Sequence, residues 1–163
     1  MEPLKVIKVP DTIKYPKLMD LFEKQTNKGV EASRIYPYYE NLANGRWTTT
    51  KCGDCGKITF PPRVICPFCY SENLSYVDIE KQGTIFAFAD AGAGVPGVLK
   101  SVAPYAVALV KFEKSGLQIA GRVYGKKSEE IKIGDTVEWG IERIEGPGPL
   151  VRYFPSYVYP GFK

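Results

Sequence analysis

Two Cys-x-x-Cys pairs constrain this chain more than any other feature of its sequence. The first pair is Cys52 and Cys55 and the second is Cys66 and Cys69, and together they are all four cysteines of the 163 residues. A Cys-x-x-Cys turn presents two thiolates to one point, so two such turns complete a tetrahedron of sulfur atoms around one metal ion. A segment this short buries too little apolar surface to fold alone, and binding of the ion then supplies its stability.

The pattern favours zinc over three alternatives. Disulfides require an oxidising compartment, and the N-terminal residues do not begin a signal peptide. Redox-active Cys-x-x-Cys motifs usually occur singly rather than as matched pairs. Iron is the strongest alternative, because rubredoxin knuckles have similar sequences, but residues 56–65 form a much shorter gap than rubredoxin has. Because the chain contains no histidine, all four ligands are thiolates, which is typical of a structural zinc site.

Composition narrows the class of protein. The hydrophobic fraction of 44% is sufficient for a core, and no apolar run approaches the roughly 20 residues of a membrane span. An intracellular metal site suggests a cytoplasmic protein. The absence of histidine removes the commonest general acid–base group, which argues against independent catalysis. The net charge is +4, but no segment has the dense run of basic residues that binds nucleic acid. A mild positive charge suits small anionic ligands at least as well as it suits nucleic acid.

Residues 1–47 are predicted to form an N-terminal helical segment that docks on a partner. Periodic apolar residues indicate one helix from Tyr15 to Lys28 and a second from Pro37 to Gly45. The aromatic faces of these helices either pack on the body of the protein or contact another protein. The candidate docking side chains in this segment are Phe22, Tyr36, Tyr38, Tyr39 and Trp47.

Residues 48–78 are predicted to form the zinc ribbon. A strand from Trp47 to Lys51 leads into the first knuckle, and a second strand from Lys57 to Phe60 leaves it. Pro61 and Pro62 cannot donate to a ladder and therefore end that strand. Arg63 follows them and either binds a phosphate or carboxylate group or remains a solvated surface side chain.

Residues 79–155 are predicted to form a small β barrel. Five strands are expected, at 84–89, 105–112, 117–123, 136–144 and 150–154, with one longer connection from Tyr124 to Lys132 that forms a short turn of helix. This number of strands matches a five-stranded OB-fold. The loop from Gly92 to Gly97 satisfies a dinucleotide-binding pattern, but the prolines around it leave no room for the required helix, so it is read as a flexible connection. The aromatic tail, 156–163, either wraps its own barrel or buries Tyr157 and Tyr159 in a partner, and the second is favoured.

Taken together, these motifs resemble the acyl-CoA-associated zinc-ribbon/OB-fold proteins, which are small subunits found with thiolases and related condensing enzymes. The resemblance covers residues 36 to about 155. It rests on the helix end at 39–46, Cys52-x-x-Cys55-Gly56, Phe60-Pro61-Pro62-Arg63, Cys66-Pro67-x-Cys69, Gly83-Thr84-Ile85, Pro104-Tyr105-Ala106-Val107-Ala108 and Ile133-Gly134-Asp135-Thr136-Val137.

The resemblance implies a mainly β protein with N-terminal helices, in which a rubredoxin-like zinc ribbon with structural Zn²⁺ precedes a five-stranded OB-fold barrel. It also implies a non-catalytic subunit that docks on a thiolase-like catalytic subunit, in a hetero-oligomer that acts on acyl-CoA thioesters. The thiolase that cleaves 2-benzoylsuccinyl-CoA in anaerobic toluene degradation is one candidate for such a complex.

Coenzyme A carries phosphates that scattered cations can hold. The candidate cations are Lys57, Arg63, Arg122, Lys126 and Lys127. The alternative function is a single-stranded nucleic-acid or RNA-associated module, since zinc ribbons and OB barrels both occur in such proteins. Three glutamates weaken this alternative because they repel phosphate: Glu138 and Glu142 on the fourth predicted barrel strand, and Glu145 directly after it.

Overall fold

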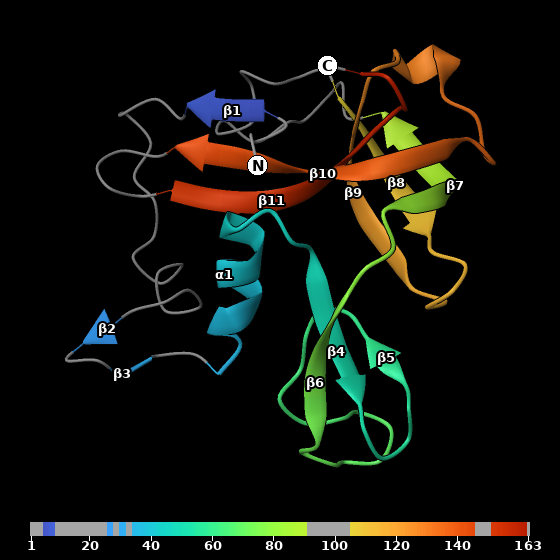
Figure 1. The fold of residues 1–163 in the computed structure, drawn as a ribbon. Helices are drawn as coiled ribbons and strands as arrows, with labels where there is room; N and C mark the ends of the chain where they lie inside the picture. Colours follow the sequence, from blue (N-terminus) through green and yellow to red (C-terminus); the bar gives the residue numbers. More distant parts are fainter. Residues whose placement is uncertain are drawn as a thin grey trace. The chain divides into compact units, whose positions relative to one another are not determined.

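The computed structural model describes residues 5–8, 26–27, 30–31, 34–90, 105–145 and 151–162. These residues fall in two compact units, 26–79 and 80–162, the second of which also includes residues 5–8 (Figure 1). Phe22 and the loop from Gly92 to Gly97 lie outside the described residues. Neither α1 nor the single 3₁₀ turn, the helices of the described ranges, has the length and apolar character of a membrane span.

The first unit contains one helix and two small sheets. Its elements are β2 (Thr26–Asn27), β3 (Val30–Glu31), α1 (Tyr36–Ala43), β4 (Thr48–Cys52), β5 (Ile58–Thr59) and β6 (Leu74–Asp78). In the three-stranded sheet β4 lies between β5 and β6 and is antiparallel to both. The second predicted helix and the predicted ribbon strands are therefore confirmed.

The first predicted helix does not extend to Lys28. Thr26 pairs with Glu31, and Asn27 pairs with Val30, as two short antiparallel strands. A β-branched threonine and an asparagine are weak helix formers, and here the pairing of β2 with β3 overrides the helical periodicity. Residues 15–25, which make up the rest of that predicted helix, lie outside the described ranges.

Three successive threonines of β4 hold the ribbon together. Thr48, Thr49 and Thr50 are all at most 2% exposed. The Thr48 hydroxyl accepts a hydrogen bond from the Asn41 side chain of α1 at 3.1 Å. The Thr50 hydroxyl accepts from the Arg63 backbone N–H at 3.0 Å. Because buried hydroxyl groups are costly without partners, these contacts connect both the helix and the Pro-Pro-Arg loop to the central strand.

The second unit is a β-sheet in which the strand pairing closes into a ring. Its strands are β1 (Lys5–Lys8), β7 (Gln82–Asp90), β8 (Ala106–Lys111), β9 (Gln118–Tyr124), β10 (Thr136–Glu145) and β11 (Val151–Val158), with a 3₁₀ turn at Ser128–Glu130. The order β7-β8-β9-β11-β10 returns to β7 through a further β10–β7 pairing. Five of the six strands thus form a ring. This confirms the mainly β fold that the sequence predicts, with a zinc ribbon followed by a multi-stranded sheet. The 3₁₀ turn lies in the predicted long connection.

The strand β1 adds to this ring from the N-terminal part of the chain. It runs parallel to β10, with Lys5 opposite Glu142 and Lys8 opposite Glu145 (Figure 1). Residues 5–8 are therefore part of the second unit's sheet and do not belong to a separate helical segment with residues 34–47.

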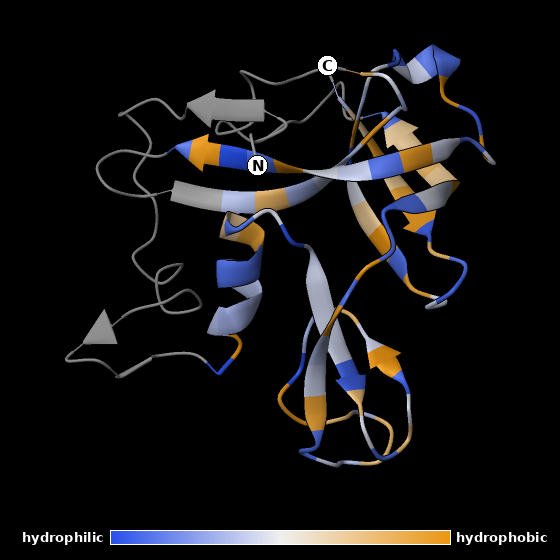
Figure 2. Ribbon diagram, in the orientation of Figure 1, coloured by the Kyte–Doolittle hydropathy of each residue, from blue (hydrophilic) through white to orange (hydrophobic). Residues whose placement is uncertain are grey.

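The inside of the ring is apolar because alternate residues of each strand point inward. In β8 the buried residues alternate with half-buried ones, and Ala106, Ala108 and Val110 are at most 4% exposed. Figure 2 shows the hydrophobic colouring of this strand. Gly121 of β9 leaves space for an aromatic ring, since a Cβ there would lie 2.8 Å from the Tyr157 ring.

The aromatic tail belongs to the sheet of its own unit. Residues up to Val158 lie in β11, and Tyr157 and Tyr159 are 1% and 9% exposed. The Tyr157 hydroxyl donates to the Ile119 carbonyl at 2.8 Å. The Tyr159 hydroxyl donates to Asp135 at 2.7 Å. This placement corrects the prediction that these two rings dock on a partner, because their surface is already buried in the fold.

Candidate metal centre and surrounding surfaces

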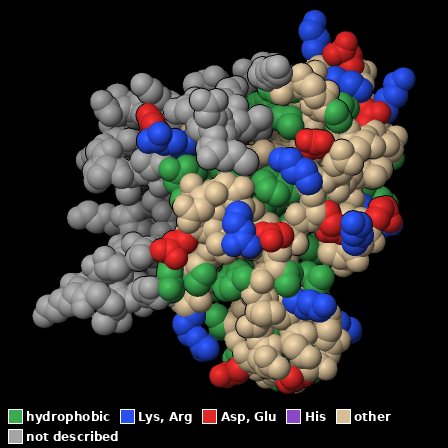
Figure 3. Space-filling model, in the orientation of Figure 1, with side chains coloured by type: hydrophobic (Ala, Val, Ile, Leu, Met, Phe, Trp, Pro, Cys, Tyr) green, Lys and Arg blue, Asp and Glu red, His purple; other side chains and the backbone are tan. Residues whose placement is uncertain are grey.

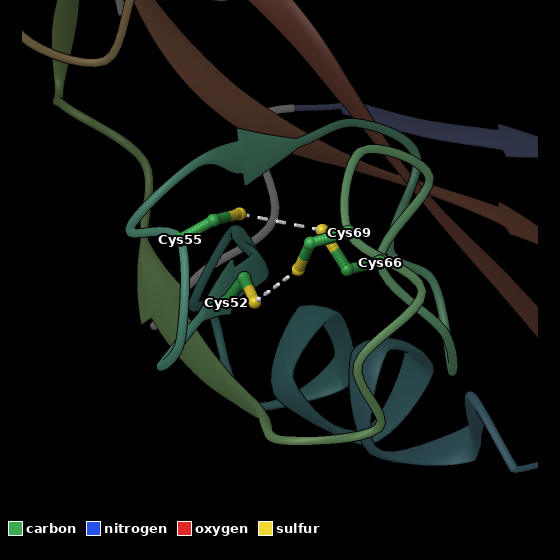
Figure 4. A group of neighbouring side chains, drawn as sticks. All are labelled: Cys52, Cys55, Cys66 and Cys69. Atoms are coloured by element: carbon green, nitrogen blue, oxygen red, sulfur yellow. Dashed lines mark hydrogen bonds between the residues drawn. The ribbon is translucent and has the colours of Figure 1, made fainter.

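The four cysteine sulfur atoms converge on one point. All of them lie within 4.8 Å of one another. The Sγ atoms of Cys52 and Cys69 are 3.6 Å apart, as are those of Cys55 and Cys66, and Figure 4 shows the four side chains pointing together from two loops. A disulfide needs a separation of about 2 Å, and all four cysteines are free.

The two knuckles share one backbone pattern. The N–H of Gly56 donates to the Cys52 carbonyl at 3.0 Å, and the N–H of Tyr70 donates to the Cys66 carbonyl at 2.9 Å. In both knuckles the N–H of the first cysteine also donates to the carbonyl five residues later, at 2.9 Å. The second Cys-x-x-Cys turn is thus a structural copy of the first, which is why the two pairs present their sulfur atoms alike.

Backbone N–H groups within each knuckle favour the thiolate form. The N–H of Cys55 is the main cause that lowers the pKa of Cys52 to about 7. Burial opposes a similar shift at Cys66, but N–H groups led by that of Phe68 lower the pKa of its thiol. A thiolate is the form that binds a metal, so the first cysteine of each knuckle is prepared to act as a ligand. At Cys69 the N–H of Ser71 acts in the same direction, but burial and the neighbouring thiols instead raise the pKa of this thiol to about 12.

The geometry fits a tetrathiolate metal ion. Zinc–sulfur bonds of about 2.3 Å in a tetrahedron place the sulfur atoms about 3.8 Å apart, which agrees with the separations of 3.6 Å across the site. Four protein ligands leave the ion no open position for a substrate, so such a site stabilises the fold and does not catalyse a reaction.

The residue that follows each knuckle has a left-handed backbone. Gly56 has a φ of 72° and Tyr70, at the same position of the second knuckle, has a φ of 60°. A Cβ on Gly56 would meet no atom within 4 Å, so a substitution there tests the backbone conformation alone. We expect Gly56→Ala to weaken zinc binding about five- to thirty-fold, corresponding to about 1–2 kcal/mol for a side chain in this region.

Competition with a chromogenic zinc chelator measures this effect. The matched variant is Tyr70→Gly, which removes a side chain from the same backbone conformation and should not weaken binding. Equal zinc affinities for Gly56→Ala and the unmodified chain would show that the left-handed conformation is not required for the metal-bound knuckle.

The aromatic residues proposed for docking contribute unequally to the core of the first unit. Trp47 is fully buried, and its ring contacts that of Phe60 edge-on with the centroids 5.8 Å apart. Burial raises the pKa of Tyr38 to about 12, although a hydrogen bond with Trp47 opposes the shift. For Trp47 this placement corrects the prediction of a docking side chain, because it packs inside its own unit. Tyr36, Tyr38 and Tyr39 on α1 are half-buried, and their contribution to docking stays a prediction.

Two of the candidate cations lie on the ribbon surface. Lys57 is exposed, and its Nζ lies 4.1 Å from the centroid of the Phe68 ring. Arg63 is also exposed, and its backbone rather than its side chain contacts Thr50. Both side chains are therefore accessible to an anionic ligand.

Two of the other three candidate cations, Arg122 and Lys126, already form ion pairs with carboxylates within the second unit. Arg122 forms an ion pair with Glu142 in which the two side chains are 12% and 0% exposed. Lys126 contacts Asp135 at 3.0 Å. Lys126 and Lys127 also line a cavity of about 410 Å³ in which Asp90 and Glu129 balance their charge. The structure therefore corrects the interpretation of Arg122 as a surface cation for phosphate, because its charge is neutralised by a buried partner.

Three features of the structure were missed by reasoning from the sequence. The threonine run predicts a strand, but its residue types alone do not show that its hydroxyl groups organise the ribbon. Tyr70, 80% exposed beside the metal site, could have been found by aligning the second knuckle with the first, where glycine stands at the same position. No pattern in the sequence indicates that Glu142 is buried, because a glutamate in a predicted strand gives the same pattern whether it is exposed or buried.

The charged side chains on one face of the molecule do not gather as they do in a nucleic-acid interface. On the face drawn in Figure 3, lysine and arginine side chains lie among aspartate and glutamate side chains and form no continuous basic area. Since binding of the phosphate backbone depends on a concentration of positive charge, this distribution argues against the nucleic-acid alternative.

Comparisons with known proteins agree with the metal-site geometry. Residues 40–75 match the family described as ChsH2, rubredoxin-like zinc ribbon domain. This match supports zinc as the structural ion of the four-cysteine site.

Two curated relatives extend the similarity beyond the ribbon. A DUF35 domain-containing scaffold protein of Methanothermobacter thermautotrophicus is 30% identical over 109 residues, which are 65% of this chain and 80% of the relative. The benzoylsuccinyl-CoA thiolase subunit BbsA of Thauera aromatica is 27% identical over 142 residues, which are 80% of this chain and 95% of that protein.

A solved structure shares the fold. It is a chain of the Ltp2-ChsH2(DUF35) aldolase, with a TM-score of 0.61 and 23% sequence identity over 75% of this chain and 91% of the other. The arrangement of ribbon and strands found here thus recurs in a known protein.

Proposed function

We propose that this chain, which belongs to the DUF35 family of scaffold proteins, is a non-catalytic accessory subunit of a thiolase-type complex that acts on acyl-CoA thioesters. The similarity to BbsA carries the proposal, because it spans 95% of a thiolase subunit and is not confined to the zinc ribbon. The alignment also covers 80% of this chain, so most of its length is similar in sequence to a thiolase subunit.

The chemistry of the chain supports a scaffolding role. The closed tetrathiolate site leaves its ion no position for a substrate. The sequence contains no histidine to act as a general base near neutral pH. The reaction then belongs to a larger catalytic subunit, and this chain contributes to its assembly.

The finer parts of the proposal concern the ligand and the contact surface. The exposed cations Lys57 and Arg63, together with Lys127, remain candidates for the phosphates of coenzyme A. The half-buried tyrosines of α1 remain candidates for contact with the catalytic subunit. 2-Benzoylsuccinyl-CoA is the candidate substrate suggested by the similarity to BbsA.

Affinity purification of the tagged full chain from its native host tests this function. We expect a thiolase-like enzyme in stoichiometric amount, identified by mass spectrometry, and thiolase activity towards an acyl-CoA in the purified complex. The control is the same purification with nuclease treatment, which should not release the partner. Recovery of RNA or single-stranded DNA without such an enzyme would overturn the proposal.

A further inference from the structure

A groove on the second unit has the size of a small-molecule site. Its volume is about 360 Å³, and its lining comes from β8 to β11 and the residue before β8. Sites for small ligands range from about 300 to 1,000 Å³, so this groove accommodates a short chain or a single ring. It is too small for a whole nucleotide-bearing ligand. The residues that determine its character are Tyr105, Val107, Ala120, Arg122, Ile144 and Phe154.

The lining is mainly apolar, with Arg122 as its one charged residue and with Ser156 and Tyr105 as further polar members. The side chains of Val107, Ala120, Ile144 and Phe154 are hydrocarbon, and Phe154 is 41% exposed although its ring is large. Exposed apolar surface in a concave site favours an apolar ligand group, because that group loses its own contact with water on binding.

The charge of Arg122 is cancelled inside the protein. Its guanidinium contacts the carboxylate of Glu142, which has no exposed side-chain surface. Burial, together with Glu142, raises the pKa of Tyr124, so that hydroxyl stays neutral. A ligand carboxylate or phosphate at this place would lose its hydration and gain no net attraction from a neutral pair. The groove therefore selects against charged groups.

The same guanidinium keeps one hydrogen-bonding group available. Among the described residues, the buried Nη1 atom of Arg122 has no hydrogen-bond partner. The half-buried Tyr105 ring lies beside the guanidinium, with its centroid 5.8 Å from Cζ, and it also lines the groove. An uncharged carbonyl oxygen is the acceptor that this buried donor lacks.

We propose that this groove binds the uncharged acyl end of a thioester, with the acyl chain on the apolar lining. In this proposal the Tyr105 ring shifts on binding, and the carbonyl oxygen accepts a hydrogen bond from Arg122 Nη1. The choice of a thioester among uncharged carbonyl compounds rests on the proposed function. The phosphates of the same ligand bind outside the groove, because the Arg122–Glu142 pair offers them no net charge.

Titration of the zinc-loaded full chain with S-hexanoyl-N-acetylcysteamine tests the proposal. This probe carries an uncharged thioester and no phosphate. We expect it to perturb the amide NMR signals of Ala120 and Gly121 and to bind at least about tenfold more tightly than hexanoate, which has the same chain but a charge. Tighter or equal binding of hexanoate would overturn the proposal, as would the absence of thioester binding.

A pair of matched variants locates the site. Ala120 is exposed, so Ala120→Leu fills the groove without disturbing the core and should weaken thioester binding at least about tenfold. Ala87→Leu makes the same change at an exposed position of β7 that does not line the groove, and it should change binding less than about twofold. Unchanged binding in Ala120→Leu would place the ligand elsewhere and overturn the inference.

The result of the thioester titration is independent of the result of the affinity purification. A chain that purifies with a thiolase-like enzyme but does not bind the probe retains its proposed function and loses this inference. Conversely, a chain that binds the probe in the groove but has no such partner retains the acyl-binding site and loses the accessory role.

Discussion

Replacing Cys52 or Cys66 with serine will release the zinc and unfold the ribbon. The unmodified protein should hold one zinc ion per chain, and each variant should retain less than about a tenth of it. The reason is that binding of a structural zinc ion supplies about 10–16 kcal/mol at neutral pH. Both cysteines are buried and each begins a knuckle, so serine removes a thiolate and leaves the remaining three with an incomplete shell. Metal analysis of the dialysed proteins measures the loss of zinc, and amide NMR measures the loss of structure in β4 to β6.

Phe68→Ala provides the control for the cysteine variants. Phe68 lies between two ligands in the second knuckle, but its side chain is 54% exposed and holds no ligand atom. Its removal should leave one zinc ion bound. If Cys52→Ser or Cys66→Ser remained folded with its full zinc content, the four-sulfur site would not be the metal centre of this protein.

Removing the carboxylate of Glu142 will destabilise the second unit by about 3–5 kcal/mol. The Glu142 side chain has no exposed surface and contacts Arg122, which is 12% exposed. In Glu142→Ala the guanidinium is left in the interior without its counter-charge, and that burial is costly. Urea unfolding followed through the amide NMR signals of β8 to β10 gives the free energy of unfolding.

A double variant separates the loss of a charge from the loss of packing. Arg122→Met combined with Glu142→Leu replaces both charges with apolar groups, and it should restore most of the stability that Glu142→Ala loses. The control Glu113→Ala breaks the exposed Lys111–Glu113 pair, whose side chains are 42% and 67% exposed. It should change the free energy of unfolding by less than about 1 kcal/mol. A Glu142→Ala effect as small as that of Glu113→Ala would show that the buried pair does not stabilise the fold.

The same double variant also bears on the acyl-binding groove. It removes the donor at Nη1 while keeping the groove apolar, so thioester binding should weaken, and the preference for the thioester over an isosteric thioether should be lost. Stability and ligand preference are separate measurements, and a folded double variant that keeps the preference for the thioester would contradict the role assigned to Arg122.

The sequence predicted the ribbon well because its signals are local. The separation of the cysteines within each pair, the glycine after Cys55 and the prolines after Phe60 act over a few residues, and a knuckle forms from such a segment whatever surrounds it. The shorter helix was predicted for the same reason, since α1 covers Tyr36–Ala43. The longer N-terminal helix was wrong at its C-terminal end, where Thr26 and Asn27 pair with β3.

The functional residues were predicted less well than the elements that carry them. Tyr157 and Trp47 are aromatic residues in polar or proline-rich surroundings, and such residues look alike whether they are buried or exposed. Their burial depends on neighbours from distant parts of the chain, since Tyr157 packs over Gly121 and Trp47 over Phe60. The sequence shows which side chains are aromatic, but it does not show which of them the fold covers.

By itself, the sequence determined a four-thiolate metal site, a mainly β fold and a chain without the commonest catalytic base. These properties follow from residue types and short spacings. Only the tertiary structure decided that β1 joins the ring of strands, that the aromatic tail is part of it, and that Arg122 is neutralised by Glu142. The physical reason is that cross-strand neighbours are set by register and by closure of the ring. These bring together residues 20 to 137 positions apart that no local pattern connects.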